Sequence, residues 1–194
     1  MPSARREWLR RAGRGRLADG AELVWSVAEG LRGRRWRASA TFEGRMTHAL
    51  TLEVDNDGRP TRLELTTDAG LLTLHPEPDE GSIHGNVVHR GGVRPLAFPW
   101  GPDHELEVVD RPIATAVMLR RLAGSVAVGE GETVAVLAID RALAVRRGSR
   151  LVRRLAERRW QVADLRGGRE VILELDAEGV PVLGRSAHDW PLEP

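Results

Sequence analysis

Residues that carry catalytic chemistry are few in this sequence, and they form none of the motifs that identify an active site. The chain has no Cys, which excludes thiolate nucleophiles, disulfides and thiolate zinc sites. It has no Lys either, which excludes Schiff-base chemistry and a phosphate-loop Lys. No Ser stands in a Gly-x-Ser-x-Gly elbow, and no phosphate or dinucleotide loop is present. We therefore predict no catalytic residue and no cofactor.

The segment from His75 to His84 combines residue types that bind divalent cations. His75, Glu77, Asp79 and His84 lie close together in the chain, and imidazole and carboxylate groups are common metal ligands. They lack the regular spacing of known metal motifs, and Pro alternating with acidic residues is typical of an exposed loop. The sequence therefore predicts no metal site. An enzyme that uses His and carboxylates of the loops in 75–105 is an alternative.

Four Trp residues are candidates for ligand contact in a chain that has two Phe and no Tyr. A Trp side chain offers a wide apolar face and one hydrogen-bond donor, a combination that suits lipid tails and sugar rings. Packing in the core is the other interpretation for each of Trp25, Trp36, Trp100 and Trp160. Trp36 and Trp160 stand among Arg residues, which favours a core Trp with Arg on the solvent face over a nucleic-acid surface.

Charge is unevenly distributed along the chain, although the net charge is only +1. Residues 53–110 contain 12 acidic residues and four Arg, whereas Arg141–Arg169 contains ten Arg and two acidic residues. The basic stretch could bind nucleic acid or an anionic membrane surface. It could equally be a solvated face that complements the acidic stretch within the fold. We favour the second interpretation and expect no nucleic-acid partner.

Alternation of apolar and polar residues runs through most of the chain and predicts antiparallel strands with one face on a core. Helix is scarce. Residues 5–16 fit a short turn or a disordered segment, and 113–122 and 149–160 fit either helical spacing or alternation. The alternating segments are 23–27, 35–42, 48–54, 61–66, 71–74, 105–109, 133–139, 160–165, 171–175 and 180–183.

Two predicted hairpins resemble each other. Residues 52–60 and 173–181 share the pattern Leu-Glu-apolar-Asp-x-acid-Gly-x-Pro. The Gly supplies the positive φ that reverses the chain, and Pro60 and Pro181 should begin a strand because Pro donates no ladder hydrogen bond. One interpretation is a duplication that produced two similar halves. The other is convergence on a favourable turn.

The chain length fits a single domain. We expect residues 1–20 to form an Arg-rich N-terminal tail and residues 21–194 to form one β-rich domain. No apolar stretch could serve as the core of a signal peptide or approach the ~20 residues needed to span a bilayer. The expected location is therefore the cytoplasm. The sequence makes no prediction of oligomeric state.

One segment carries a resemblance to a known family. Residues 108–122 run from Val108-Val109 through Asp110-Arg111-Pro112 to Arg120-Arg121-Leu122. This segment resembles a bacterial glycolipid-binding family whose biochemical function is uncharacterised. Further segments follow in matching order, and the similarity covers residues 22–191. Those segments are 63–70, 134–143 and 176–180.

The sequence departs from this family at several positions. The family's Thr-Asn-Thr step is Ala114-Thr115-Ala116 here, and a Trp that follows its Asp-Gly is replaced by Leu71 and Leu72. The resemblance implies a large antiparallel sheet curled into a half-barrel, as in lipoprotein carriers, with a groove on its concave side.

The patterns and the resemblance together predict a mainly β fold with few short helices and a non-enzymatic function. We expect the concave face to bind a glycolipid or another amphiphilic ligand. Apolar walls would come from Trp25, Trp36, Trp100 and Trp160. Arg120 and Arg121 would alternate on a strand, one toward an anionic or hydroxylated headgroup and one toward solvent. The alternative role for both Arg residues is a structural one, pairing with the acidic stretch.

Overall fold

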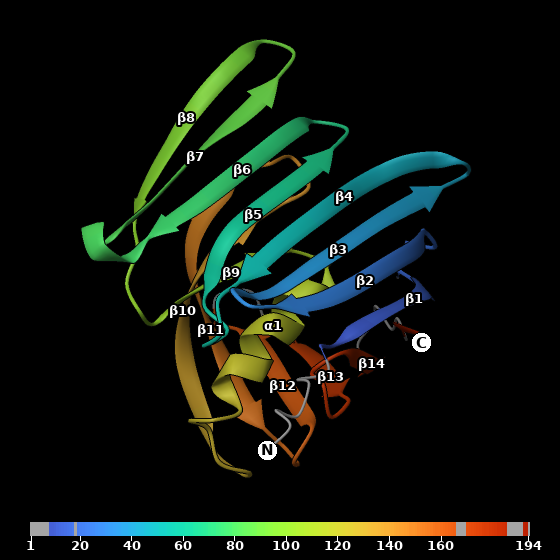
Figure 1. Ribbon diagram of the computed structural model, residues 1–194, viewed down its shortest axis with the longest axis vertical. Coiled ribbons are helices and arrows are strands. Elements are labelled where there is room, and N and C mark those ends of the chain that lie inside the picture. The colour runs from blue at the N-terminus through green and yellow to red at the C-terminus, as the bar shows by residue number, and fades with distance from the viewer. Residues whose placement is uncertain (1–7, 18, 166–169, 186–191, 194) are drawn as a thin grey trace, which may run out of the picture.

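The computed structural model describes residues 8–17, 19–165, 170–185 and 192–193. They form two β-sheets, and the larger sheet A curls around the other elements (Figure 1). Sheet A has nine strands in the order β15-β1-β2-β3-β4-β5-β6-β7-β8. Its strands are β1 (Arg10–Arg16), β2 (Glu22–Gly30), β3 (Gly33–Phe42), β4 (Arg45–Val54), β5 (Pro60–Thr67), β6 (Gly70–Glu77), β7 (Ser82–His89), β8 (Gly92–Pro99) and β15 (Leu192–Glu193).

Sheet B has six strands in the order β14-β13-β12-β11-β10-β9. Neighbouring strands are antiparallel except β9 and β10, which run parallel and are joined by helix α1 (Pro112–Leu122). A crossover between parallel strands needs such a helix-sized connection. The strands are β9 (His104–Val108), β10 (Gly131–Ile139), β11 (Val145–Arg154), β12 (Arg159–Asp164), β13 (Glu170–Leu175) and β14 (Pro181–Arg185), and a short 3-10 turn, η1 (Pro78–Glu80), joins β6 to β7.

The predicted fold class is confirmed: the protein is mainly β, with a large antiparallel sheet curled into a half-barrel. Two ambiguous segments are now assigned. Residues 113–122 are helical, with Pro112 at the first turn, and 149–160 belongs to β11 and β12 with a turn between them. The expected N-terminal tail needs a correction, because residues 10–16 form β1 and pair along their whole length with β2.

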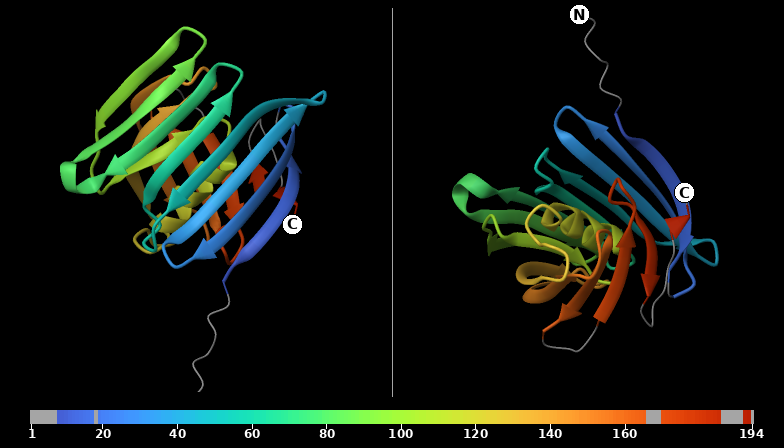
Figure 2. Two further views of the ribbon diagram at one scale, coloured as in Figure 1. Left: turned by 45° about the horizontal axis from the view of Figure 1, so that its top comes forward. Right: turned by 90° about the horizontal axis from the view of Figure 1, so that it is seen from below.

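Helix α1 lies between the two sheets (Figure 2). Ile113, Ala114 and Val117 pack with the inner side chains of sheet A, and residues from the other side of the helix pack on sheet B. A helix that is apolar on all sides is expected to be buried. The residues that α1 packs against sheet B are Ala116, Met118, Leu119 and Leu122.

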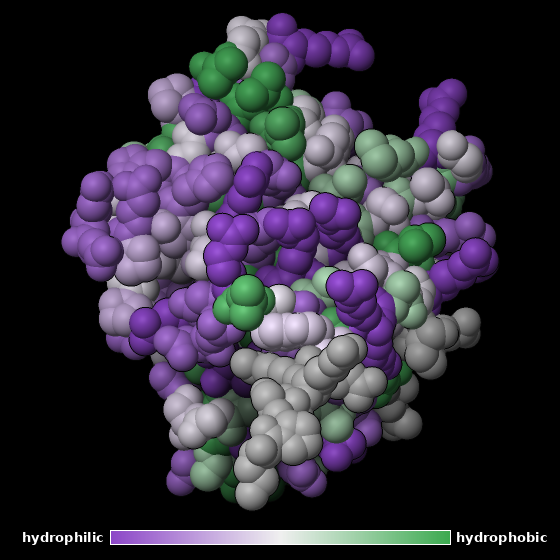
Figure 3. Space-filling view, viewed as in Figure 1, coloured by the Kyte–Doolittle hydropathy of each residue, from purple (hydrophilic) through white to green (hydrophobic). Residues whose placement is uncertain are grey.

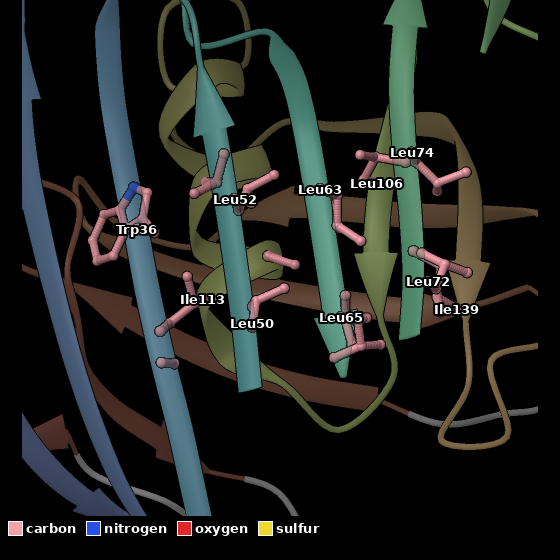
Figure 4. Close-up of a cluster of buried hydrophobic side chains, with 14 of the residues drawn as sticks. Trp36, Leu50, Leu52, Leu63, Leu65, Leu72, Leu74, Leu106, Ile113 and Ile139 are labelled. Carbon is pink, nitrogen blue, oxygen red and sulfur yellow. The ribbon is translucent and has the colours of Figure 1, made fainter. Parts of the chain in front are cut away.

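The inner face of sheet A is a continuous apolar layer. Leu63, Leu65, Leu72 and Leu74 are directly paired across β5 and β6, and they point toward Leu106, Ile113 and Ile139 in the close-up (Figure 4). Direct cross-strand pairs on one face bring their side chains into contact. The concave side of sheet A is therefore filled by α1 and by strands β9 and β10.

The two similar hairpins form the same turn. Asp55 Oδ1 accepts hydrogen bonds from the backbone N–H groups of residues 57 and 59, and Asp176 Oδ1 accepts them from residues 178 and 180. Pro60 and Pro181 begin β5 and β14, as predicted. A third turn, Asp140–Ala144, repeats part of this pattern with Leu143 in place of Gly. Since that turn lacks the shared motif, local turn chemistry is sufficient to produce the likeness.

The outer surface seen in the direction of Figure 1 is mostly hydrophilic (Figure 3), as alternation on half-buried strands requires. Apolar residues gather where hairpin β7–β8 ends, and Val88 and Val93 are exposed there. In the described part of the chain, no helix has the length and apolar character needed to cross a bilayer.

Candidate functional site

The four Trp residues predicted to contact a ligand lie in the core. Trp25, Trp36 and Trp160 are each 1% exposed and Trp100 is 6% exposed. The Trp25 and Trp36 rings pack against each other, with 6.2 Å between their centroids. Trp160 lies beneath the Arg154 guanidinium, and its neighbour Arg159 is exposed. These Trp residues therefore fill space between the elements and do not form open walls.

Arg120 and Arg121 stand in the last turn of α1, so the expected alternation on a strand is wrong. Successive helical residues point about 100° apart, and the two side chains reach different hairpin turns. Arg121 packs by its Cβ near Gly58, and its Nε donates to Glu105 Oε1. Arg120 packs against Gly179. Arg121 thus takes the structural role, pairing with the acidic stretch.

A cleft of about 150 Å³ opens between sheet B and the first turn of α1. One wall is apolar and comes from the inner faces of β12 and β13. The polar wall adjoins it on the same sheet and combines side chains from β9, β11 and β12 with Thr115 of α1. The apolar residues include Val162, Val171 and Leu173, and the polar residues include Glu107, Arg150 and Asp164.

Arg150 joins the two carboxylates of the polar wall. Its Nε donates to Glu107 Oε1 at 3.0 Å and its Nη2 donates to Glu107 Oε2, while Nη1 lies 3.4 Å from Asp164 Oδ2. Arg150 and Asp164 are direct cross-strand partners, and this position fixes their spacing. A guanidinium has five donors and no acceptor, whereas each carboxylate has about four acceptor positions. Arg150 therefore holds the carboxylates in place while leaving acceptor capacity toward the cleft.

The segment that leads into α1 closes one end of the cleft and is conformationally strained. Asp110 has φ +62°, a left-handed conformation that costs a non-Gly residue about 1 kcal/mol. Arg111 occupies the N-cap position without a side-chain cap, and its Nη1 donates to the Asp110 carbonyl at 2.9 Å. Strained residues of this kind concentrate at functional sites, so the strain at Asp110 is consistent with a binding role for this segment.

Two buried ionisable residues lie near the ends of α1. Burial raises the pKa of Glu105 to about 7, against the opposing influence of Arg121. Burial, together with the charge of Arg111, lowers the pKa of His48 to about 3. Neither ring nitrogen of His48 has a hydrogen-bond partner among the described residues. Glu105 is 1% exposed and His48 is buried to the same degree, so neither contacts solvent in the folded protein.

The groups of the alternative enzyme hypothesis have separate environments in the structure. His104 stacks near Trp100, with ring centroids 5.6 Å apart, and its Nδ1 accepts a hydrogen bond from the Gly101 N–H. His84 instead hydrogen-bonds to Ser82 through Nε2. His104, in β9 of sheet B, and His84, in β7 of sheet A, therefore have different partners in different sheets.

The basic stretch is partly used inside the fold. Arg150 pairs with Glu107, and Arg154 donates to the backbone carbonyls of Ala123 and Val126. Arg141 lies 3.8 Å from Asp68, which adds a second link to the acidic stretch. These contacts agree with the interpretation that the basic and acidic stretches complement each other, while other Arg residues of the stretch remain exposed.

Sequence reasoning missed the polar wall of the cleft. Arg150 and Glu107 are 43 residues apart, and no motif connects them. The available signal was the alternation in β9, which places Glu105 and Glu107 on the same face as each other and opposite to Leu106 and Val108. Strand β9 is buried on both sides, so two acidic residues on one of its faces would have indicated a polar site.

The architecture is shared with a protein of known structure. The crystal structure of a DUF1089 family protein from Pseudomonas aeruginosa matches this chain with a TM-score of 0.60 and 19% sequence identity. The match covers 82% of this chain and 87% of the other. No known protein family profile and no curated protein sequence matches the chain. At this identity the structural likeness shows the fold alone.

Proposed function

We propose that the protein is a non-catalytic binding protein for a small hydroxyl-bearing ring, with the sugar headgroup of a glycolipid as the preferred ligand. The ring would occupy the cleft between α1 and sheet B. The observation that carries this proposal is the combination of an acceptor-rich wall, Glu107 and Asp164 held by Arg150, with an apolar wall beside it on sheet B.

The polar wall suits a ligand that donates several hydrogen bonds. Arg150 directs its donors to the two carboxylates and to the Ser149 carbonyl. Arg111 and Thr115 line the cleft as donors, and the carboxylates of Glu107 and Asp164 give it acceptors for a ligand that donates. Sugar hydroxyls are donors of this kind, and a few placed polar groups in a largely apolar pocket are the usual basis of small-ligand specificity.

The apolar wall suits one face of a ring. Val162, Val171 and Leu173 line it from adjacent strands. A cavity of about 150 Å³ is large enough for a single six-membered ring. It is too small for an acyl chain, so a lipid attached to the ring would extend out of the cleft. This proposal moves the ligand from the Trp-lined concave face expected from the sequence to the inner face of sheet B.

The glycolipid part of the proposal is supported by the resemblance of residues 108–122 to a glycolipid-binding family, and this segment includes Asp110 of the cleft. The hydroxyl-bearing ring is supported by the chemistry of the walls alone. The two parts can therefore be tested separately.

Saturation-transfer difference NMR with octyl glucoside below its micelle concentration tests the proposal. We expect strong transfer to the ring protons and weak transfer to the alkyl protons. Val171→Phe fills the cleft and should abolish the signal, and Thr115→Val should weaken binding about fivefold through one lost hydrogen bond. Thr51→Val, on a strand of sheet A away from the cleft, is the matched control. Transfer confined to the alkyl chain, or a signal unaffected by Val171→Phe, would refute the proposal.

A further inference from the structure

The connection between β6 and β7 brings three metal-ligating side chains together on the surface of sheet A. Glu77 ends β6, Glu80 lies in η1 and His84 lies in β7, and one ligand atom from each lies within 4.8 Å of the others. Asp79, which the sequence placed beside these residues, is not a member of the cluster. The surface lies on the left side of the molecule in Figure 1.

We propose that this cluster binds a divalent transition-metal cation, Zn²⁺ in the first instance. Glu77, Glu80 and His84 would be ligands, and a water molecule would complete a tetrahedral set. His75, although it is the direct cross-strand partner of His84, is not a member of the cluster. Carboxylate oxygens and imidazole nitrogens in a set of four are an established donor combination for Zn²⁺.

A hydrogen bond orients His84 for coordination. Ser82 Oγ lies 2.9 Å from His84 Nε2, which leaves Nδ1 as the ring nitrogen free to bind a cation. Metal-binding His residues typically have their second nitrogen held by such a partner, and this partner fixes the tautomer and the ring orientation.

The carboxylates of this cluster differ in their ion pairing from other Glu residues of the described chain. Among the described residues, neither Glu77 nor Glu80 forms an ion pair, whereas Glu53, Glu64 and Glu107 each pair with an Arg. Two adjacent carboxylates repel each other unless a cation lies between them. In a chain with 29 Arg residues, an unneutralised pair beside an oriented His is the arrangement that an external cation would complete.

The backbone holds the cluster in a defined turn. Gly81 adopts φ +63°, its N–H donates to the Pro78 carbonyl at 3.1 Å, and its own carbonyl accepts from the Trp100 N–H at 2.9 Å. The backbone positions of Glu77, Glu80 and His84 are therefore set by the turn. Cation binding then needs ordering of the side chains only, and this limits the entropic cost of binding.

Zinc binding by the full-length protein without an affinity tag tests this inference. Competition with a chromophoric chelator should give one Zn²⁺ per chain, and Co²⁺ substitution should give the intense visible absorption of a tetrahedral site. We expect His84→Gln and Glu80→Gln to weaken Zn²⁺ binding at least about tenfold. His89→Gln and Glu132→Gln change the same residue types at other surface positions and should leave it unchanged.

The outcomes are decisive because all of these side chains lie on the surface, and circular dichroism will show that the variants remain folded. An absence of stoichiometric Zn²⁺ binding overturns the inference, and so does equal loss in the control variants. His75→Gln should leave Zn²⁺ affinity unchanged, and a loss equal to that of His84→Gln would overturn the ligand set of Glu77, Glu80 and His84. This result is independent of the ring-binding cleft, which shares no residue with the cluster.

Discussion

The inner faces of the two sheets differ in polarity. Sheet A turns an unbroken set of apolar side chains inward, and His48 is its one buried polar residue among those the structure describes. Sheet B turns Glu105, Glu107 and Arg150 toward α1. Apolar side chains can fill an interior to crystal-like density, whereas ion-paired groups need fixed distances and leave space. The cleft lies on the sheet that carries the charges.

The apolar face of sheet A contributes to stability, whereas the charged face of sheet B is the candidate for binding. Burying an ion pair gains little stability over an apolar pair of equal volume, so the charges of sheet B are poorly explained by folding alone. The apolar layer of sheet A, by contrast, is sufficiently explained by folding. Variants that affect the two faces unequally can therefore test this difference.

The largest expected effect is the loss of core volume at sheet A. Trp36→Ala should lower the free energy of unfolding by about 3–5 kcal/mol, because a fully buried aromatic side chain is replaced by a cavity. Val171→Ala, in the half-buried wall of the cleft, should cost less than about 1 kcal/mol. Urea denaturation measures both. Equal costs would show that sheet B is packed as tightly as sheet A.

The next largest effect concerns the polar wall. Arg150→Gln should destabilise the protein by about 3 kcal/mol, because it leaves Glu107 and Asp164 close together without their cation. The double variant Arg150→Gln/Glu107→Gln should recover part of this loss. A double-mutant cycle that shows simple additivity would mean that the pair is not coupled.

A third test uses pH, because Glu105 and His48 impose opposite pH dependences on the stability of the protein. The pKa of Glu105 is raised from about 4.5 to about 7, so its contribution to stability is present below pH 4.5 and lost as the pH rises through 7. Relative to Glu105→Gln, the natural protein should lose on the order of 2 kcal/mol between pH 5 and pH 7.5.

His48 imposes the opposite pH dependence on stability. Its pKa is lowered from 6.5 to about 3, so stability is lost as the pH falls below 6.5. His48→Leu should therefore flatten the acid side of the profile and leave the interval above pH 6.5 unchanged. Chemical denaturation at several pH values measures both variants. A rise in stability from pH 5 to pH 7.5 that Glu105→Gln leaves unaltered would contradict the assignment of Glu105.

The smallest effect distinguishes the two similar hairpins. Gly58 and Gly179 have φ of +81° and +82°, so an Ala at either position should cost about 1 kcal/mol in backbone strain. A Cβ at residue 179 would also lie 2.5 Å from Arg120 Cδ, whereas at residue 58 the nearest atom is 3.6 Å away. Gly179→Ala should therefore lower the melting temperature more than Gly58→Ala, and the reverse order would exclude the Arg120 contact.

Features that depend on neighbouring residues could be predicted from the sequence. Alternation of apolar and polar side chains predicted most strands and the burial of Trp36 and Trp160, because each side chain on a strand faces the side opposite to its neighbour. The Asp-x-acid-Gly turns and the strand starts at Pro60 and Pro181 followed from local backbone preferences.

Features that depend on partners distant in the chain became visible in the three-dimensional structure. Residues 112–122 became a helix because they connect parallel strands β9 and β10, and that pairing cannot be read from local spacing. The wall of Glu107, Arg150 and Asp164 forms only when β9, β11 and β12 meet in one sheet. Local chemistry thus specified the strands and turns, while long-range packing specified the cleft.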